Sequence, residues 1–174
     1  MTPLFAIYVG AKAATNLTQG IRRSTWGWKH SAMDKGDARA VAAAMRASDV
    51  LALGAGGPDP RVGPGQWSDA KLRKLILVRV VSPLYLDTTP LWPDEAYPNR
   101  VGFELLEELD LRYRRHVGAG LMEALRMSAN KNGVAVRAGH VEDCAELLSA
   151  MSRPADIRAT RIPGPAGRTE ARRD

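Results

Sequence analysis

The feature that most limits the fold of this chain is the irregular alternation of short strand-like segments with helical ones. Residues 4–9 form an apolar run with β-branched and aromatic members, which predicts a buried strand. Residues 16–23 favour a helix, and residues 38–47 predict another because they are rich in strong helix formers. The evenly spaced βαβ units of a doubly wound sheet are missing, and no GxGxxG motif stands between a strand and a helix. The pattern therefore favours a small mixed β-barrel with helices around it.

The middle of the chain is predicted to be mostly sheet. Residues 49–54 indicate a strand, and the glycine- and proline-rich stretch 54–65 predicts a loop after it. Residues 71–87 alternate polar and apolar side chains and then become β-branched, which predicts a long strand that bends near Pro83. A proline-punctuated loop over 88–99 leads into a further strand over 101–106.

The last third predicts two helices and a tail. Residues 118–129 have an amphipathic helical pattern that Asn132-Gly133 ends, and residues 141–151 suggest a second helix. Residues 153–174 contain arginine, proline, glycine and alanine without an apolar period, so a disordered basic tail is expected there. We thus expect one folded domain over 1–152 and a tail over 153–174.

Charge and cysteine content limit the possible partners. The formal net charge of the 174 residues is +6, which favours association with polyanions. Cys144 is the only cysteine, so neither an intramolecular disulfide nor a cysteine-rich zinc site can form, and we expect a small buried side chain there. The sequence has no signal-peptide pattern and no apolar run long enough to span a membrane, so a cytoplasmic location is expected, with no metal and no cofactor.

The tryptophans give the first indication of function. The chain has four tryptophans and two phenylalanines, and Trp28, Trp67 and Trp92 stand in polar or Gly/Pro-rich sequence that predicts exposed loops. An exposed indole face is a stacking platform for a nucleobase, and two facing rings can hold a base that has left its stack. The alternative is that such tryptophans anchor loops to the barrel.

Two segments resemble a known family. The segment FAIYVGAKAATNLTQGIRRSTWGWK is similar to the opening of YTH and EVE domains, with Asn16 at a helix start and Trp26 ten residues later. The segment LWPDEAYPNRVGFELL resembles prokaryotic EVE-type domains, including those of modification-dependent restriction systems, through Trp92, Tyr97 and Arg100. The resemblance covers roughly residues 4 to 110 and implies an α+β, PUA-like (EVE/YTH) mixed β-barrel of about five to six strands surrounded by helices.

The resemblance also implies a binding site. A methylated or hydroxymethylated base in DNA would be flipped between Trp26 and Trp92, while the amide of Asn16 donates to and accepts from its edge. Ser24, Thr25, Trp28 and Tyr97 would complete the base-binding set. One departure is the Gly27-Trp28 pair, because the family often has a small hydroxyl residue after the first cage tryptophan. The residues expected to contact phosphates are Lys29, His30, Arg61, Lys71, Arg73, Lys74 and Arg100.

Other classes of function have weaker support or stay open. His116, Asn130 and His140 do not make an HNH nuclease, because the residues between the first two form a helical pattern, and the chain lacks GxSxG and P-loop motifs. We therefore expect a binding protein rather than an enzyme, with nucleic acid as its partner and a nuclease as a possible second one. Two alternatives remain: an RNA (tRNA) modified-base binder, or a module that binds a peptide or protein.

Overall fold

A computed structural model of the chain describes residues 1–59, 61–68, 70–110 and 118–152. Its centre is one six-stranded sheet with the strand order β2-β5-β4-β3-β1-β6. The strands are β1 (Pro3–Val9), β2 (Thr25–Trp28), β3 (Val50–Ala55), β4 (Lys74–Leu86), β5 (Asn99–Asp110) and β6 (Val136–His140). The helices are α1 (Ala14–Arg22), α2 (His30–Met33), α3 (Ala38–Ala44), α4 (Pro64–Ser68), α5 (Ala119–Asn130) and α6 (Ala145–Met151), with short 3-10 turns η1 (Ala11–Ala13) and η2 (Val141–Asp143).

The predicted class is confirmed, since a mixed α+β domain with six strands and surrounding helices is what the chain forms. Among the strands that the structure describes, β1 and β3 are the one parallel pair, and the other neighbouring strands are antiparallel. The pairing of β4 with β5 shifts register three times, which bends this long hairpin as the sequence predicted. Within the described residues the outer strands β2 and β6 do not pair with each other, and the indole N–H of Trp28 on β2 donates at 3.0 Å to the carbonyl of Gly133, in the turn between α5 and β6.

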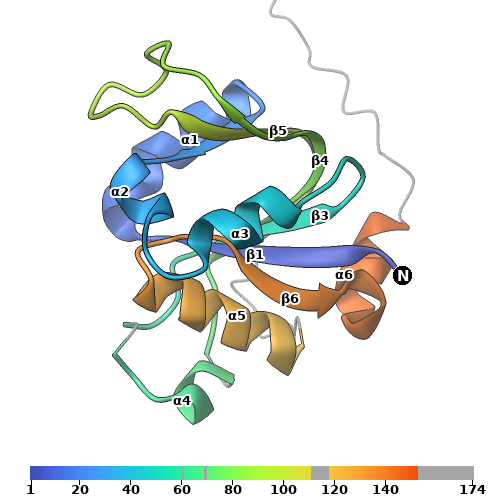
Figure 1. Cartoon of the computed structure of the whole chain (residues 1–174). Helices are drawn as coiled ribbons and strands as arrows, with labels where there is room; N and C mark the ends of the chain where they lie inside the picture. The colour runs from blue at the N-terminus through green and yellow to red at the C-terminus, as the bar shows by residue number, and fades with distance from the viewer. Residues whose placement is uncertain (60, 69, 111–117, 153–174) are drawn as a thin grey trace, which may run out of the picture.

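Both faces of the sheet are apolar, because its central strands are buried on two sides. Leu75 and Leu77 of β4 belong to the cluster that includes α5, whereas Ile76 and Val78 belong to the cluster on the opposite face, with α3. Figure 1 shows α5 and α3 on opposite sides of β1. Figure 1 also shows the loop between β4 and β5 extending at the end of the molecule where α1 and α2 lie.

Several predicted boundaries are wrong. The sequence around Trp28, expected to form an exposed loop, is the strand β2, whose four residues are all buried. The stretch 54–65 holds the end of β3 and the start of α4, where Pro64 occupies the first helical position. The strand β6 was not expected, and the helix expected over 141–151 is divided into η2 and α6. The expected stop after α5 is confirmed, with positive φ at Asn132 (59°) and Gly133 (77°).

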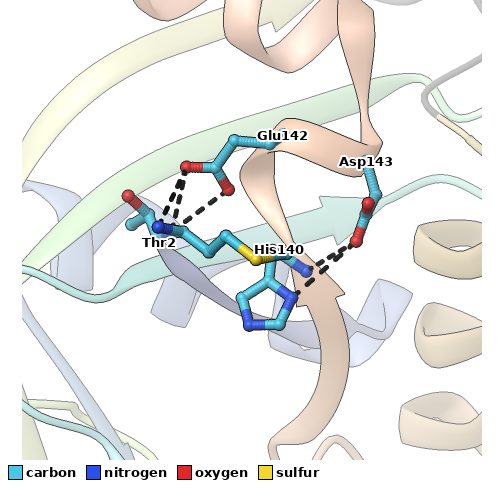
Figure 2. Close-up of polar contacts among 5 residues, drawn as sticks. Thr2, His140, Glu142 and Asp143 are labelled. Carbon is cyan, nitrogen blue, oxygen red and sulfur yellow. Dashed lines mark hydrogen bonds and ion pairs between the residues drawn. The ribbon is translucent and has the colours of Figure 1, made fainter.

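The start of β1 is fixed to the turn that follows β6. The backbone N–H of Thr2 donates to both carboxylate oxygens of Glu142, at 3.0 and 3.1 Å, as Figure 2 shows. The backbone N–H of His140 donates to Asp143 in the same turn. These contacts hold the edge pair of β1 and β6 at its outer end. The predicted basic tail, 153–174, lies outside the described residues, and no helix in the described part of the chain is long and apolar enough to cross a membrane.

Candidate functional site

An aromatic pocket of about 530 Å³ opens where the carboxyl end of β1 meets β2, α2 and the loop between β4 and β5. We define the aromatic pocket by the residues that line it, which are 8–10, 12, 13, 16, 26–29, 31, 32, 35, 92, 97, 129, 132 and 133. Its volume falls within the roughly 300–1,000 Å³ that is typical of small-ligand sites. Five of the seven predicted base-binding residues therefore meet in one cavity: Asn16, Trp26, Trp28, Trp92 and Tyr97.

The tryptophans are not the exposed loop residues that the sequence suggested. Trp26 and Trp28 lie on β2 with 7% and 4% of their surface exposed, and Trp92 is 5% exposed although it stands in a loop. Trp67 is fully buried on α4, outside the aromatic pocket, with its edge against the ring of Tyr8. The polar residues around each tryptophan gave no indication of this burial, because one aromatic side chain can be buried while its neighbours in the chain stay exposed to water. The expectation of exposed indole platforms is corrected accordingly.

The cluster formed by Trp26, Trp92 and Tyr97 is packed against itself. The rings of Trp26 and Trp92 stand nearly perpendicular, with centroids 6.4 Å apart and planes at 73°. Trp92 and Tyr97 repeat this edge-to-face arrangement at 5.2 Å and 79°. Such contacts are favourable between aromatic rings, but a base sandwich needs two parallel faces. In this conformation, therefore, a base has no slot between Trp26 and Trp92, and the open space lies beside them.

One indole N–H in the described structure has no acceptor. Trp28 donates to the Gly133 carbonyl, Trp92 to the Asn16 carbonyl at 3.0 Å, and Trp67 to the Asp59 carbonyl at 3.3 Å. The Nε1 of Trp26 is buried without a hydrogen bond. A buried donor without a partner costs about 1–3 kcal/mol, and such groups are rare in folded proteins. The Cε3 edge of the same indole lies near Gly20 of α1, so Nε1 is on the ring edge opposite that helix.

Asn16 is held in a polar network at the mouth of the cluster. Its Nδ2 donates to the Asp94 carboxylate at 3.0 Å and to the Tyr97 hydroxyl at 3.2 Å, and that hydroxyl donates to Asp94 at 2.7 Å. Both partners require the amide nitrogen at this position, so the orientation of the amide is set by its network. The amide donors of Asn16 are thus occupied, and its Oδ1, which makes no hydrogen bond within the described residues, is the atom left for a ligand.

The same network shifts two pKa values. The hydrogen bond from Tyr97 holds the pKa of Asp94 below its usual range, and the Asn16 amide acts in the same direction. Burial raises the pKa of Tyr97 to about 12, and its hydrogen bond to the Asp94 carboxylate adds to the rise. At neutral pH the network therefore consists of an ionised aspartate and a neutral tyrosine, with the amide between them.

Gly27 explains how the loop can lie so close to β2. A Cβ at this position would stand 2.9 Å from two carbon atoms of the Trp92 indole and 2.9 Å from the Cβ of Tyr97. Any side chain there would push both aromatic residues outward. The lack of a side chain at Gly27 thus has a local reason, which is the direct contact of Trp92 and Tyr97 with the β2 backbone.

Arg100 is the main correction among the predicted phosphate-binding residues. Its side chain is buried, with 3% exposed. Its guanidinium donates to the carbonyls of Tyr97 and Thr89 and pairs with Asp87 at 3.0 Å, while it lies 5.5 Å from the centre of the Trp92 ring. These contacts fasten both ends of the loop that carries Trp92. A guanidinium used in this way is a structural clamp, so we remove Arg100 from the groups that face a phosphate.

The remaining predicted residues are dispersed. Ser24 and Thr25 do not line the aromatic pocket, because Ser24 is in the turn before β2 and the Thr25 hydroxyl donates to the Arg23 carbonyl. Lys29 lines it, pairs with Glu95 and lies 5.8 Å from the Tyr97 ring centre. His30 lies 3.3 Å from the side-chain amide of Asn99, through its Nδ1. Of the others, Arg61 pairs with Asp59, and Lys71 is exposed and does not line the aromatic pocket. Arg73 and Lys74 line a second hollow, which does not include Lys71.

Sequence reasoning missed three residues of the site. Lys12 and Lys35 line the aromatic pocket and make no ion pair within the described residues, so the pocket carries positive charge beside Lys29. Asp94 orients Asn16. Proximity to Asn16 in the sequence could have indicated Lys12, whereas Asp94 lies 78 residues away and only folding brings it there. Within the described ranges no group of three or more histidine, cysteine, aspartate or glutamate side chains is placed to hold a metal ion.

Comparisons with known proteins give structural neighbours only. No family model matches the chain, and no curated protein matches it. Among solved structures, the chain is similar to a YTH domain-containing protein mmi1 and RNA complex, with 16% identity over 85% of this chain and 81% of the other, and a TM-score of 0.46. A complex of the Mmi1 YTH domain with RNA gives 15% identity, coverage of 85% and 77%, and a TM-score of 0.46. A crystal structure of the MmI1 YTH domain has 18% identity over 63% of this chain and 69% of the other, with a TM-score of 0.38.

Proposed function

We propose that this chain binds a modified nucleobase of a single-stranded polynucleotide in the aromatic pocket and does no chemistry on it. The observation that carries the proposal is the buried indole N–H of Trp26, which has no acceptor among the described residues, in a residue that lines the aromatic pocket beside Trp28, Trp92 and Tyr97. An acceptor atom on the edge of a base would satisfy this donor, and Oδ1 of Asn16 would accept from an amino or imino N–H of the same base. The aromatic rings would supply apolar surface, and contact of the base and its methyl group with that surface would stabilise the complex.

Because Trp26 and Trp92 stand edge to face, entry of the base requires Trp92 to move. Arg100 would keep both ends of the loop between β4 and β5 in place during this movement, and Trp92 would give up its hydrogen bond to the Asn16 carbonyl and its contact with the Arg100 guanidinium. When Trp92 moves, its contacts with the other rings of the cluster are replaced by stacking on the base. Stacking of a base on an aromatic ring stabilises the complex by about 1–3 kcal/mol. A methyl group buried in the same space would add about 0.8 kcal/mol, which is roughly a fourfold preference for the modified base.

We favour RNA over the DNA that the sequence suggested. Flipping a base out of a duplex costs a few kcal/mol of unpairing and unstacking free energy, which a base in a single-stranded region avoids. Sequence-specific RNA recognition uses unstacked bases in this way. The lysines of the pocket, Lys12, Lys29 and Lys35, are placed to attract the backbone of either polymer. RNA is also the polymer named in two of the similar structures, and DNA becomes the comparison in the experiment.

Fluorescence anisotropy at fixed salt tests the proposal. Matched single-stranded RNA and DNA oligonucleotides would carry one unmodified adenine or cytosine, N6-methyladenine, 5-methylcytosine or 5-hydroxymethylcytosine. We expect one modified RNA to bind at least about fourfold tighter than its unmodified match, and Trp26→Phe to reduce that ratio. Trp67→Phe is the control, because Trp67 is an equally buried tryptophan outside the aromatic pocket. Equal affinity for all oligonucleotides, or binding that does not depend on salt, would exclude the proposal and favour a peptide-binding module.

A further inference from the structure

A second hollow of about 690 Å³ lies on the other side of the turn that joins β1 to α1. We call it the arginine hollow and define it by Arg22 at the end of α1, Arg73 before β4, and a floor that includes Leu17 and Ile76. It shares Tyr8, Val9 and Gly10 with the aromatic pocket. The two cavities are therefore neighbours across one short piece of backbone.

The charge of the arginine hollow suits an anion. Lys74 pairs with Glu108 at its edge, so this acid and base compensate each other. Arg22 and Arg73 make no ion pair and no side-chain hydrogen bond within the described residues, and they are the remaining charged groups that line the hollow. Two guanidinium groups beside one cavity can each present parallel N–H donors to the oxygens of a phosphate.

Arg73 is also held in place before any ligand arrives. A Cβ added to Gly56 would stand 2.6 Å from the Cβ of Arg73, 2.7 Å from its Cγ and 2.9 Å from its Cδ. The stem of Arg73 therefore lies directly on the Gly56 backbone, which has a φ of 69° that favours glycine. The Arg73 backbone N–H donates to the Ala55 carbonyl at 3.1 Å in the same place. This packing limits the freedom of the stem, while the guanidinium stays exposed.

The turn between the two cavities leaves room for a polymer to cross. Gly10 is exposed, and a Cβ added there would meet nothing within 4 Å. Lys12 stands on the same turn and lines the aromatic pocket. Positive side chains thus lie on the turn and on both of its sides, while the floor of the arginine hollow is apolar enough to contact a base or a sugar.

We propose that the arginine hollow is a subsite for the nucleotide next to the modified base, in which Arg22 and Arg73 bind the phosphodiester that links the two. This inference rests on the proposed function and extends it from a single base to a path along an RNA strand. Phosphate contacts of this kind fix the position of the strand and carry no information about the base itself. Affinity and base discrimination should therefore respond to different residues.

Paired variants separate the two claims. Arg22→Ala is matched by Arg23→Ala, its exposed neighbour that lines neither cavity, and Arg73→Ala is matched by Lys71→Ala on the same segment. Each would be titrated by fluorescence anisotropy with a short labelled RNA that carries the preferred modified base, at several salt concentrations. We expect Arg22→Ala and Arg73→Ala each to weaken binding about 5- to 10-fold and to reduce the salt slope by roughly 0.7, with the ratio of modified to unmodified affinity unchanged. The matched controls should change affinity by less than about twofold.

Competition with smaller probes identifies the group that is bound. The modified nucleoside, its dinucleotides extended on the 5′ or the 3′ side, and inorganic phosphate would each displace the labelled RNA. We expect one dinucleotide to compete better than the nucleoside in the wild type, and to lose that advantage in Arg73→Ala. Arg73→Lys should restore part of it, because lysine keeps the charge without the paired donors. Competition by inorganic phosphate as good as that of the dinucleotide would overturn the subsite and indicate a free-anion site.

The failures are distinguishable. The subsite is overturned if each arginine variant weakens binding no more than its matched control, that is, if Arg22→Ala equals Arg23→Ala and Arg73→Ala equals Lys71→Ala. If the modified base is still preferred over the unmodified one in those titrations, the proposed function stands. If the wild type binds modified and unmodified RNA with the same affinity, both proposals fail. All four substituted residues are exposed, so each variant should keep the circular dichroism spectrum of the wild type and stay folded at the temperature of the titrations.

Discussion

The unpartnered N–H of Trp26 leads to a prediction about the free protein that needs no ligand. Trp26→Phe and Trp28→Phe remove the same ring atoms from two buried positions on β2, with 7% and 4% of the residue exposed. The loss of apolar contacts is therefore similar in the two variants. What differs is the hydrogen bond, because Trp28 donates to the Gly133 carbonyl and the Trp26 N–H finds no acceptor in the described part of the chain.

The expected difference follows from that contrast. Trp28→Phe loses a bond worth about 0.5–1.5 kcal/mol and leaves a partly buried carbonyl without its donor. Trp26→Phe instead removes a donor whose burial costs about 1–3 kcal/mol. Trp26→Phe should thus be more stable than Trp28→Phe by roughly 2–3 kcal/mol, which for a domain of this size is a difference of about 4–12 °C in melting temperature.

Circular dichroism is the appropriate measurement, since the substitutions themselves change tryptophan fluorescence. Thermal and urea unfolding would be followed for both variants and for Trp92→Phe, which loses its bond to the Asn16 carbonyl and should behave like Trp28→Phe. Equal destabilisation of the Trp26 and Trp28 variants would refute the reasoning, because it would mean that the Trp26 N–H already has an acceptor in the free protein.

Three further predictions concern the loop that carries Trp92. Gly27→Ala should destabilise the fold by about 1–3 kcal/mol in urea unfolding, since its Cβ would stand 2.9 Å from the Trp92 ring; an unchanged midpoint would show that the loop yields freely. Arg100→Met keeps the apolar bulk but leaves two carbonyls without a donor, so we expect a loss of about 3 kcal/mol and faster proteolysis within the loop, and a stable loop would contradict the clamp. The pKa of Asp94 is lower in the folded state than in the unfolded chain, so its stabilisation is present above about pH 4 and is lost as the pH falls through the folded pKa. Asp94→Asn should flatten this acid-side loss in unfolding experiments, and a profile identical to the wild type would exclude the network with Tyr97.

The central strands of the sheet could be predicted from the sequence, because they are short apolar runs of the kind that forms buried strands. Residues 4–9, 49–54 and 71–87 were predicted as strands and form β1, β3 and β4 with small changes at their ends. The strand β2 was missed because its four residues, TWGW, are too few for a period, and it is buried by a partner, β5, that is distant in sequence. The strand β6 contains two polar residues and a glycine, and only its pairing with β1 makes it a strand.

The sequence by itself determined which side chains are available to the site, since the resemblance to YTH and EVE domains points to Asn16, Trp26, Trp92 and Tyr97, and these four meet in one pocket. Tertiary structure decided what those side chains can do. Packing closed the expected slot between Trp26 and Trp92, and burial made Arg100 hold the loop instead of facing solvent. Asp94 and the Tyr97 hydroxyl accept both amide hydrogens of Asn16. The physical reason is that residue identity sets the chemistry of a group, whereas free donors, acceptors and faces depend on neighbours that the chain brings together from distant positions.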